Sequence, residues 1–179
     1  MAFFNIEQLG EIVHPNISAT QCDTLAEYCI VALENETHKS GCILKVLGDH
    51  QNEYELIWSK EVKKGGYQEP KKIVEKAAEA ISFFLVRECT EYTVVMESKI
   101  GTGVDFWLSY DELHELYDPL NFLQARIEIS GIKTESKSNK AMKRQTSKKK
   151  QMNRSDSSNL PAYVSIVEIA TPKAIFSKK

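Results

Sequence analysis

The most constraining feature of this sequence is the order of its hydrophobic periods after residue 70. An apolar stripe with the 3.6-residue period of a helix runs from Pro70 to about Cys89, and proline suits the first turn of a helix. The alternation typical of strands follows in three segments, at 92–100, 104–109 and 122–132. Then come a polar helix and two strands, at about 138–152, 163–170 and 174–176. This order predicts an α/β fold in which helices flank a mixed β-sheet, with the core order αβββαβ.

The residues before this core predict a smaller N-terminal extension. Ser18 begins a capping box, so a helix is expected over about 19–35. A Gly-Asp-His-Gln-Asn turn then separates two expected strands of a β-hairpin, at 42–47 and 53–58. The predicted parts of the chain are therefore a helix-plus-hairpin extension and an α/β core, at 1–68 and 69–179.

The composition excludes several classes of protein. With 179 residues and 42% hydrophobic content, the chain can bury the core of one domain. No apolar run reaches the roughly 18–20 residues of a membrane span, and the N-terminus lacks the features of a signal peptide. The four cysteines are scattered without a CxxC pair, and the four histidines are dispersed. We therefore expect a cytoplasmic protein with reduced cysteines, no zinc site and no membrane association.

The net charge of −2 conceals a strong division along the chain. Residues 1–132 contain 11 Lys and Arg against 22 Asp and Glu, whereas residues 133–179 contain 12 against 3. The segment 133–154 holds nine of these basic residues and a single acid. Such a segment suits the phosphates of DNA or RNA, which are bound without sequence preference, or else it is a solvated loop that faces the acidic part of the chain. The expected nucleic-acid contacts are Lys140, Lys143, Arg144, Lys148, Lys149 and Lys150.

Two acidic residues fall on the predicted strands of the core. Asp105 lies in Gly-Val-Asp-Phe-Trp, and Glu128 lies in Glu-Ile-Ser, 23 residues later. Together with the element order over roughly residues 70–170, they make the chain resemble the PD-(D/E)xK, or restriction-endonuclease-like, superfamily. Its members place an acid on the second core strand and a (D/E)-x-K tripeptide on the third. The resemblance implies metal-dependent hydrolysis of a phosphodiester in nucleic acid, or a degenerate version that no longer cleaves.

The resemblance also implies a magnesium site. Its ligands would be Asp105 and Glu128, with Glu79 on the preceding helix as a third candidate. A divalent cation polarises the phosphate and lowers the pKa of a bound water, and Mg²⁺ needs only one or two protein carboxylates. Because strand side chains alternate, Glu128 and Ser130 share one face of their strand.

Ser130 stands where the resembled motif has lysine. A hydroxyl donates a hydrogen bond but brings no positive charge, whereas lysine stabilises developing negative charge. Arg126 on the same predicted face and Lys133 just beyond the strand are the expected substitutes, and Lys140 and Lys143 also lie within reach. The expected catalytic set is Asp105, Glu128, Ser130, Lys133 and Arg126.

A different class of function accounts for the same residues. Isolated Asp and Glu side chains on strands are commonly solvated, and Arg126 with Glu128 would then be a same-face ion pair of little energetic worth. The chain would be a non-catalytic protein-interaction subunit of a bacterial defence or toxin-linked complex. Its acidic part and its basic segment would recognise a partner without cleaving it.

Overall fold

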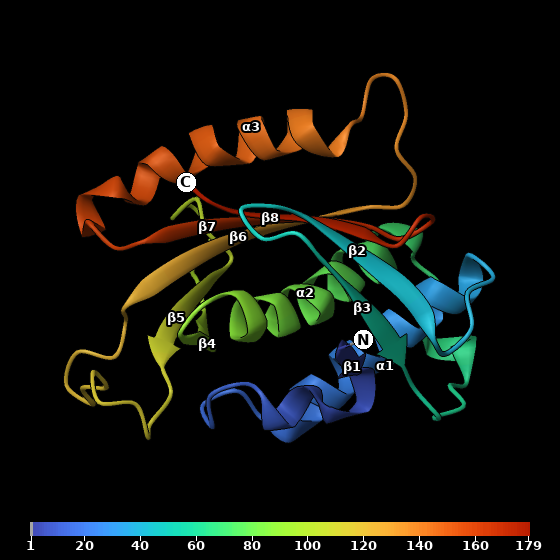
Figure 1. The fold of residues 1–179 in the computed structure, drawn as a ribbon, viewed down its shortest axis with the longest axis horizontal. Coiled ribbons are helices and arrows are strands. Elements are labelled where there is room, and N and C mark those ends of the chain that lie inside the picture. The colour runs from blue at the N-terminus through green and yellow to red at the C-terminus, as the bar shows by residue number, and fades with distance from the viewer. Residues whose placement is uncertain (1) are drawn as a thin grey trace.

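The structure, a computed structural model, describes residues 2–179 and contains one eight-stranded sheet with helices on both faces (Figure 1). The strands are β1 (Ala2–Asn5), β2 (Cys42–Gly48), β3 (Asn52–Ile57), β4 (Tyr92–Glu97), β5 (Phe106–Tyr110), β6 (Ala125–Ile132), β7 (Ala162–Glu168) and β8 (Lys173–Lys178). The helices are α1 (Ala19–Asn35), α2 (Pro70–Cys89) and α3 (Ala141–Gln151). Three short 3-10 turns are η1 (Ile6–Glu11), η2 (Lys64–Gly66) and η3 (Met152–Ser158). The predicted α/β fold with a mixed sheet flanked by helices is confirmed.

The strand order across the sheet is β1-β3-β2-β8-β7-β6-β5-β4. From β4 to β6 the chain runs as an antiparallel meander, and β7 then pairs with β6 in parallel. Parallel neighbours need a crossover connection, and α3 with η3 makes this one across the face of the sheet. The chain order from α2 to β7 is therefore helix, three strands, helix, strand.

The two faces of the sheet are covered unequally, as Figure 1 shows: α1 and α2 lie against one face, and α3 lies on the other. The side chains of β6 divide accordingly. Ile127 and Ile129 join the large core beneath α2, and Ile132 joins the smaller core with Ala141 and Met152 under α3. Because side chains alternate along a strand, the even-numbered residues of β6 face α3.

Local sequence signals account for the helices and the hairpin. The predicted helix over 19–35 is α1, with the Ser18 hydroxyl accepting a hydrogen bond from the Gln21 amide at 3.2 Å. The helix predicted after Pro70 is α2, and β2 and β3 form the expected antiparallel hairpin. The basic helix is shorter than the predicted 138–152, because it begins at Ala141 and ends at Gln151.

The N-terminal part of the chain belongs to the same sheet as the rest. Strand β2 pairs in parallel with β8, and β3 and β1 continue the sheet beyond it. Residues of α1 and α2 contribute to one continuous hydrophobic core. The division of the chain at residues 68 and 69 thus falls between elements that share a sheet and a core.

A glycine brings α2 close to β6. A Cβ atom at Gly131 would lie only 2.5 Å from the carbonyl oxygen of Val74 on α2. No other residue fits at this crossing without moving the helix or the strand. The close approach holds Glu75 and Glu79 of α2 beside the exposed end of β6, where both line a pocket with Gly131.

Within residues 2–179, no helix combines the length and the apolar character that crossing a bilayer requires.

Candidate active site

The candidate site lies where β6 extends beyond its neighbour β5. Strand β5 begins at Phe106, opposite Ile127, so the following residues of β6 have no partner on that side. The Asp105 carboxylate, directly before β5, takes the place of a strand there. Its Oδ2 accepts a hydrogen bond from the backbone N–H of Ile129 at 2.7 Å. Asp105 is thereby fixed at the edge of β6, next to Glu128.

Glu128 is a buried carboxylate that faces α3. Only 1% of its surface is exposed. Its Oε1 accepts hydrogen bonds from the Nζ of Lys148 and, at 2.9 Å, from the Nε2 of Gln151. Its Oε2 is buried and has no hydrogen-bond donor within residues 2–179. That oxygen therefore lacks the N–H or O–H donor that burial normally demands. The neighbouring Asp105 carboxyl is within hydrogen-bond reach of Glu128 and partners it when one of the two carboxyl groups is protonated.

Burial and like charge act together on the two carboxyl groups. Burial and then the negative charge of Asp105 raise the pKa of Glu128 to about 7, against the lowering effect of Lys148. Burial also raises the pKa of Asp105, although the Ile129 N–H and the Lys148 charge oppose it. A buried and a half-buried carboxylate, with one lysine that pairs with Glu128, carry a negative charge that is only partly compensated.

A third acid, Glu79, approaches the pair from α2. It lines a pocket of about 240 Å³ together with Glu75, Asp105, Ser130 and Lys148. Burial raises the pKa of Glu79 to about 7, although Lys76 lies 2.8 Å away. The acid that the sequence proposed as a third candidate is therefore in the same pocket as Asp105.

A second hollow of about 400 Å³ opens on the other side of the carboxylates. Glu79, Asp105 and Glu128 line it together with the loop between β4 and β5. Gly103 in this loop has a positive φ of 81°, and a Cβ there would lie 2.6 Å from the carbonyl oxygen of Gln151. The loop consequently packs against the end of α3 and keeps Asp105 close to Glu128.

Among the predicted substitutes for the missing lysine, none reaches the carboxylates; Lys148 does. The sequence placed Lys148 among the nucleic-acid contacts, but its ammonium pairs with Glu128. Gln151, three residues further along α3, was not predicted at all. Residues at this spacing share a helix face, which was the available signal, but the sequence does not say which face of α3 meets the sheet. Ser130 does line the pocket, and its hydroxyl accepts a hydrogen bond from Arg144 at 3.2 Å.

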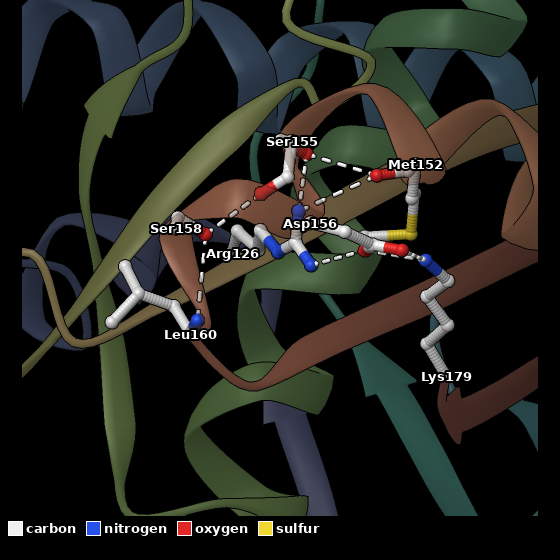
Figure 2. Close-up of polar contacts among 7 residues, drawn as sticks. All are labelled: Arg126, Met152, Ser155, Asp156, Ser158, Leu160 and Lys179. Atoms are coloured by element: carbon white, nitrogen blue, oxygen red, sulfur yellow. Dashed lines mark hydrogen bonds and ion pairs between the residues drawn. The ribbon is translucent and has the colours of Figure 1, made fainter.

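Arg126 lies elsewhere, although it shares a strand face with Glu128. Figure 2 shows its guanidinium reaching η3, where it donates to the Ser155 hydroxyl and, at 3.4 Å, to the Met152 carbonyl. It also forms an ion pair with Asp156 at 2.7 Å, and Lys179 pairs with the same carboxylate. These contacts hold η3 on the sheet and direct the arginine away from the pocket.

The remaining predicted residues are not brought to the carboxylates. Lys133 is paired with Glu36 at 3.0 Å and does not line either hollow beside Asp105. Lys149 donates to the carbonyl of Lys178 at 2.7 Å. Three of the predicted nucleic-acid contacts are exposed lysines that make no ion pair within residues 2–179: Lys140, Lys143 and Lys150.

The donor set limits which metal the site suits. Across residues 2–179, no three or more His, Cys, Asp and Glu side chains group with the geometry of a metal site. What the site offers is the Asp105–Glu128 pair, with Glu128 Oε2 lacking a donor. Hard carboxylate oxygens in this number fit Mg²⁺, which completes its shell with waters and phosphate.

Comparison with known proteins adds no relative. No protein family, curated protein or solved structure matches this chain. The class of protein is therefore defined by the fold and the site alone: an α/β protein with one mixed sheet, and a carboxylate pair with a lysine where two strands separate.

Proposed function

We propose that this protein is a metal-dependent phosphodiester hydrolase that acts on nucleic acid and resembles the PD-(D/E)xK nucleases. One observation carries the proposal. Asp105 at the second strand and Glu128 on the third strand of the α2–β7 unit line one hollow. Lys148 pairs with Glu128 and lines, with Asp105, the adjacent carboxylate pocket. These are the strands on which the resembled family carries its acids.

The main difficulty for this proposal is that Ser130 stands where the resembled motif has lysine, and Lys148 supplies the missing positive charge. The motif lysine lies two residues after the acid on the same strand, whereas here the positive charge arrives from α3. The Lys148 ammonium hydrogen-bonds Glu128, so it lies at the same carboxylate that a strand lysine would neighbour. A phosphate bound beside Glu128 would meet this ammonium, which would stabilise negative charge developing on it.

The charges of the pocket support a divalent cation. The Asp105 charge acts on a Glu128 carboxyl that has a single lysine and an oxygen with no donor. Asp105 and Glu128 would hold Mg²⁺, which polarises a phosphate and lowers the pKa of a bound water. A cation there would compensate the Asp105 charge, which adds to burial in raising the pKa of Glu128 to about 7.

Glu79 has a further role open to it. Its carboxyl lines the pocket, and its pKa of about 7 lets it hold or release a proton near neutral pH. Lys76 steadies its ionised form. Glu79 is thus the residue that we assign to proton transfer at the pocket, whereas the family resemblance offers it as a third metal ligand.

Cleavage assays on labelled DNA and RNA with Mg²⁺ or Mn²⁺ test the proposal. We expect metal-dependent cleavage that falls by about 100-fold or more in Asp105→Asn and Glu128→Gln, the size of losing a main electrostatic group. Lys45→Gln is the matched control, because Lys45 is exposed on β2, makes no ion pair within residues 2–179 and is not among the expected nucleic-acid contacts. Cleavage in EDTA, or cleavage by Glu128→Gln at the wild-type rate, would contradict the assignment.

A metal titration separates an inactive site from an absent one. If Asp105 and Glu128 bind the cation, millimolar Mn²⁺ raises the melting temperature of the wild type and not that of Asp105→Asn. A shift without cleavage of either polymer would indicate the non-cleaving version of the fold. No shift and no cleavage would reject the metal-dependent hydrolase altogether.

A further inference from the structure

A basic hollow lies next to the carboxylate pocket. It has a volume of about 350 Å³, and its charged lining consists of Lys71, Lys133 and Arg144 with the single acid Glu75. It shares Glu75 and Gly131 with the carboxylate pocket, so the two adjoin along the end of β6. The carboxylate pocket has the opposite balance, with Glu75, Glu79 and Asp105 against Lys148.

Arg144 is fixed between the two hollows. Its Nη1 donates to the Gly131 carbonyl at 2.7 Å and to the Ser130 hydroxyl at 3.2 Å. No hydrogen bond of its Nη2 or Nε is present within residues 2–179, and the side chain is half-buried. A guanidinium oriented in this way on one edge keeps donors for a phosphate on its other edges.

The position of Arg144 also explains the role of Ser130, whose hydroxyl helps to orient the guanidinium. A hydroxyl at this position accepts from Arg144, whereas the ammonium of the motif lysine would repel it. Arg144 and Lys148 are four residues apart on α3, so their Cβ atoms are separated by about 5–6 Å on one helix face. One helix therefore presents two positive charges along the end of β6, one at each hollow.

We propose that the basic hollow is a second phosphate subsite. It takes the phosphate of the neighbouring nucleotide while the phosphate to be cleaved lies at Asp105, Glu128 and Lys148, and Arg144 is its main contact. The inference rests on the proposed hydrolase function and names its substrate class. The substrate is a nucleic-acid chain with consecutive phosphates, and not an isolated phosphodiester.

Two substrates that differ in their number of phosphates test the subsite. One is a short single-stranded oligonucleotide, and the other is bis(p-nitrophenyl) phosphate, which has one phosphate only. We expect Arg144→Gln to lower kcat/KM on the oligonucleotide by about 10- to 100-fold, as for a lost charge-assisted contact. Hydrolysis of the small diester should stay within about twofold of wild type. Arg144→Lys should restore part of the loss, and Lys45→Gln, at an exposed lysine outside the expected nucleic-acid contacts, should change neither rate.

Three outcomes overturn the subsite. They are an unchanged oligonucleotide rate in Arg144→Gln, an equal fall on both substrates, and a fall of the oligonucleotide rate in the exposed control Lys45→Gln that is as large as the fall in Arg144→Gln. The second would place Arg144 in the cleavage site itself. The third would reduce the effect to general charge.

Binding distinguishes failure of the subsite from failure of the hydrolase. Fluorescence anisotropy with the labelled oligonucleotide and Ca²⁺ measures affinity without turnover. If wild type cleaves nothing, a tenfold weaker Kd in Arg144→Gln than in Lys45→Gln still supports the subsite, and the proposed hydrolysis alone fails. Equal Kd values in the two variants overturn the subsite, whether or not wild type cleaves. Melting curves of both variants confirm that they are folded.

Discussion

Two buried charges lie two residues apart on the same face of β6, and only one of them belongs to a candidate site. Arg126 is 3% exposed and Glu128 is 1% exposed, and both meet the α3–η3 segment. Arg126 faces acceptors and an opposite charge. Glu128 faces a like charge and a hollow as well as its lysine. A buried charge is therefore no sign of function by itself; a buried charge with a like-charged neighbour beside a cavity is one.

The ion pairs Arg126–Asp156 and Lys148–Glu128 also respond to pH in opposite ways. Lys179 and then Arg126 hold the pKa of Asp156 below its ordinary value, so this carboxylate stays ionised around neutral pH. The pKa of Glu128 is raised to about 7, chiefly by burial. A raised pKa means that the folded state binds the proton more tightly than the unfolded state. The Glu128 contribution to stability is therefore greatest below about pH 4.5 and is lost as pH rises through 7.

The largest stability effect is expected from Lys148→Met. Removing the lysine leaves Glu128 buried without an opposite charge, which costs about 2–3 kcal/mol at pH 8.5, since Lys148 is itself partly exposed. At pH 5.5 Glu128 is protonated in both proteins, so the cost should fall below about 1 kcal/mol. Urea unfolding at the two pH values measures the difference.

Lys149→Met is the control for Lys148→Met, because Lys149 contacts only the Lys178 carbonyl. It should cost the same small amount at both pH values. An equal cost of Lys148→Met at pH 5.5 and 8.5 would mean that Glu128 does not titrate in this range. The contrast between the Arg126 and Glu128 sites in their response to pH would then be lost.

A smaller and pH-independent effect is expected from Arg126→Met. The substitution leaves the Ser155 hydroxyl without its guanidinium donor, at a cost of about 1–2 kcal/mol. The Met152 carbonyl loses its bond from Arg126 but still accepts one from the Ser155 hydroxyl at 3.1 Å. The guanidinium does not titrate, so the cost should be the same at pH 5.5 and 8.5. Unfolding free energies from urea titrations check this. A cost that grows with pH, as for Lys148→Met, would show that Arg126 acts through Glu128.

The sequence predicts the local part of this fold and not its long-range pairing. The period of α2, the Ser18 cap and the β2–β3 turn are each signals within a few residues of the element they define. The parallel pairing of β2 with β8 joins residues far apart in the chain, and no local signal specifies it. For the same reason the sequence suggested an extension where the structure has a continuous sheet.

The residues of the candidate site also differ in whether the sequence could indicate them. Asp105 and Glu128 follow from their strand positions together with the family resemblance. The role of Lys148 depends on which face of α3 meets the sheet, and the sequence gives no reason to separate it from Lys149 and Lys150. The direction of Arg126 depends on η3, whose Ser155 and Asp156 come 29 and 30 residues later.

The smallest effect on stability is expected where the basic segment is exposed. Replacing Lys140, Lys143 and Lys150 with glutamine removes three charges that make no ion pair within residues 2–179, so the melting temperature should change by no more than about 1 °C. Affinity for duplex DNA at low salt should nevertheless fall. The slope of log K against log salt should become shallower by up to about 2.7, since each neutralised phosphate contributes about 0.9.

A matched triple variant shows whether position matters or only charge. Lys39, Lys45 and Lys63 are exposed, lie before the basic segment and make no ion pair within residues 2–179. Changing them to glutamine removes the same charge and should leave the slope unchanged, because phosphates that are not in contact release no counterions. An equal loss in both triples would make binding a matter of net charge. No binding by wild type at about 50 mM salt would favour the interaction-subunit alternative, in which the acidic part of the chain repels the duplex.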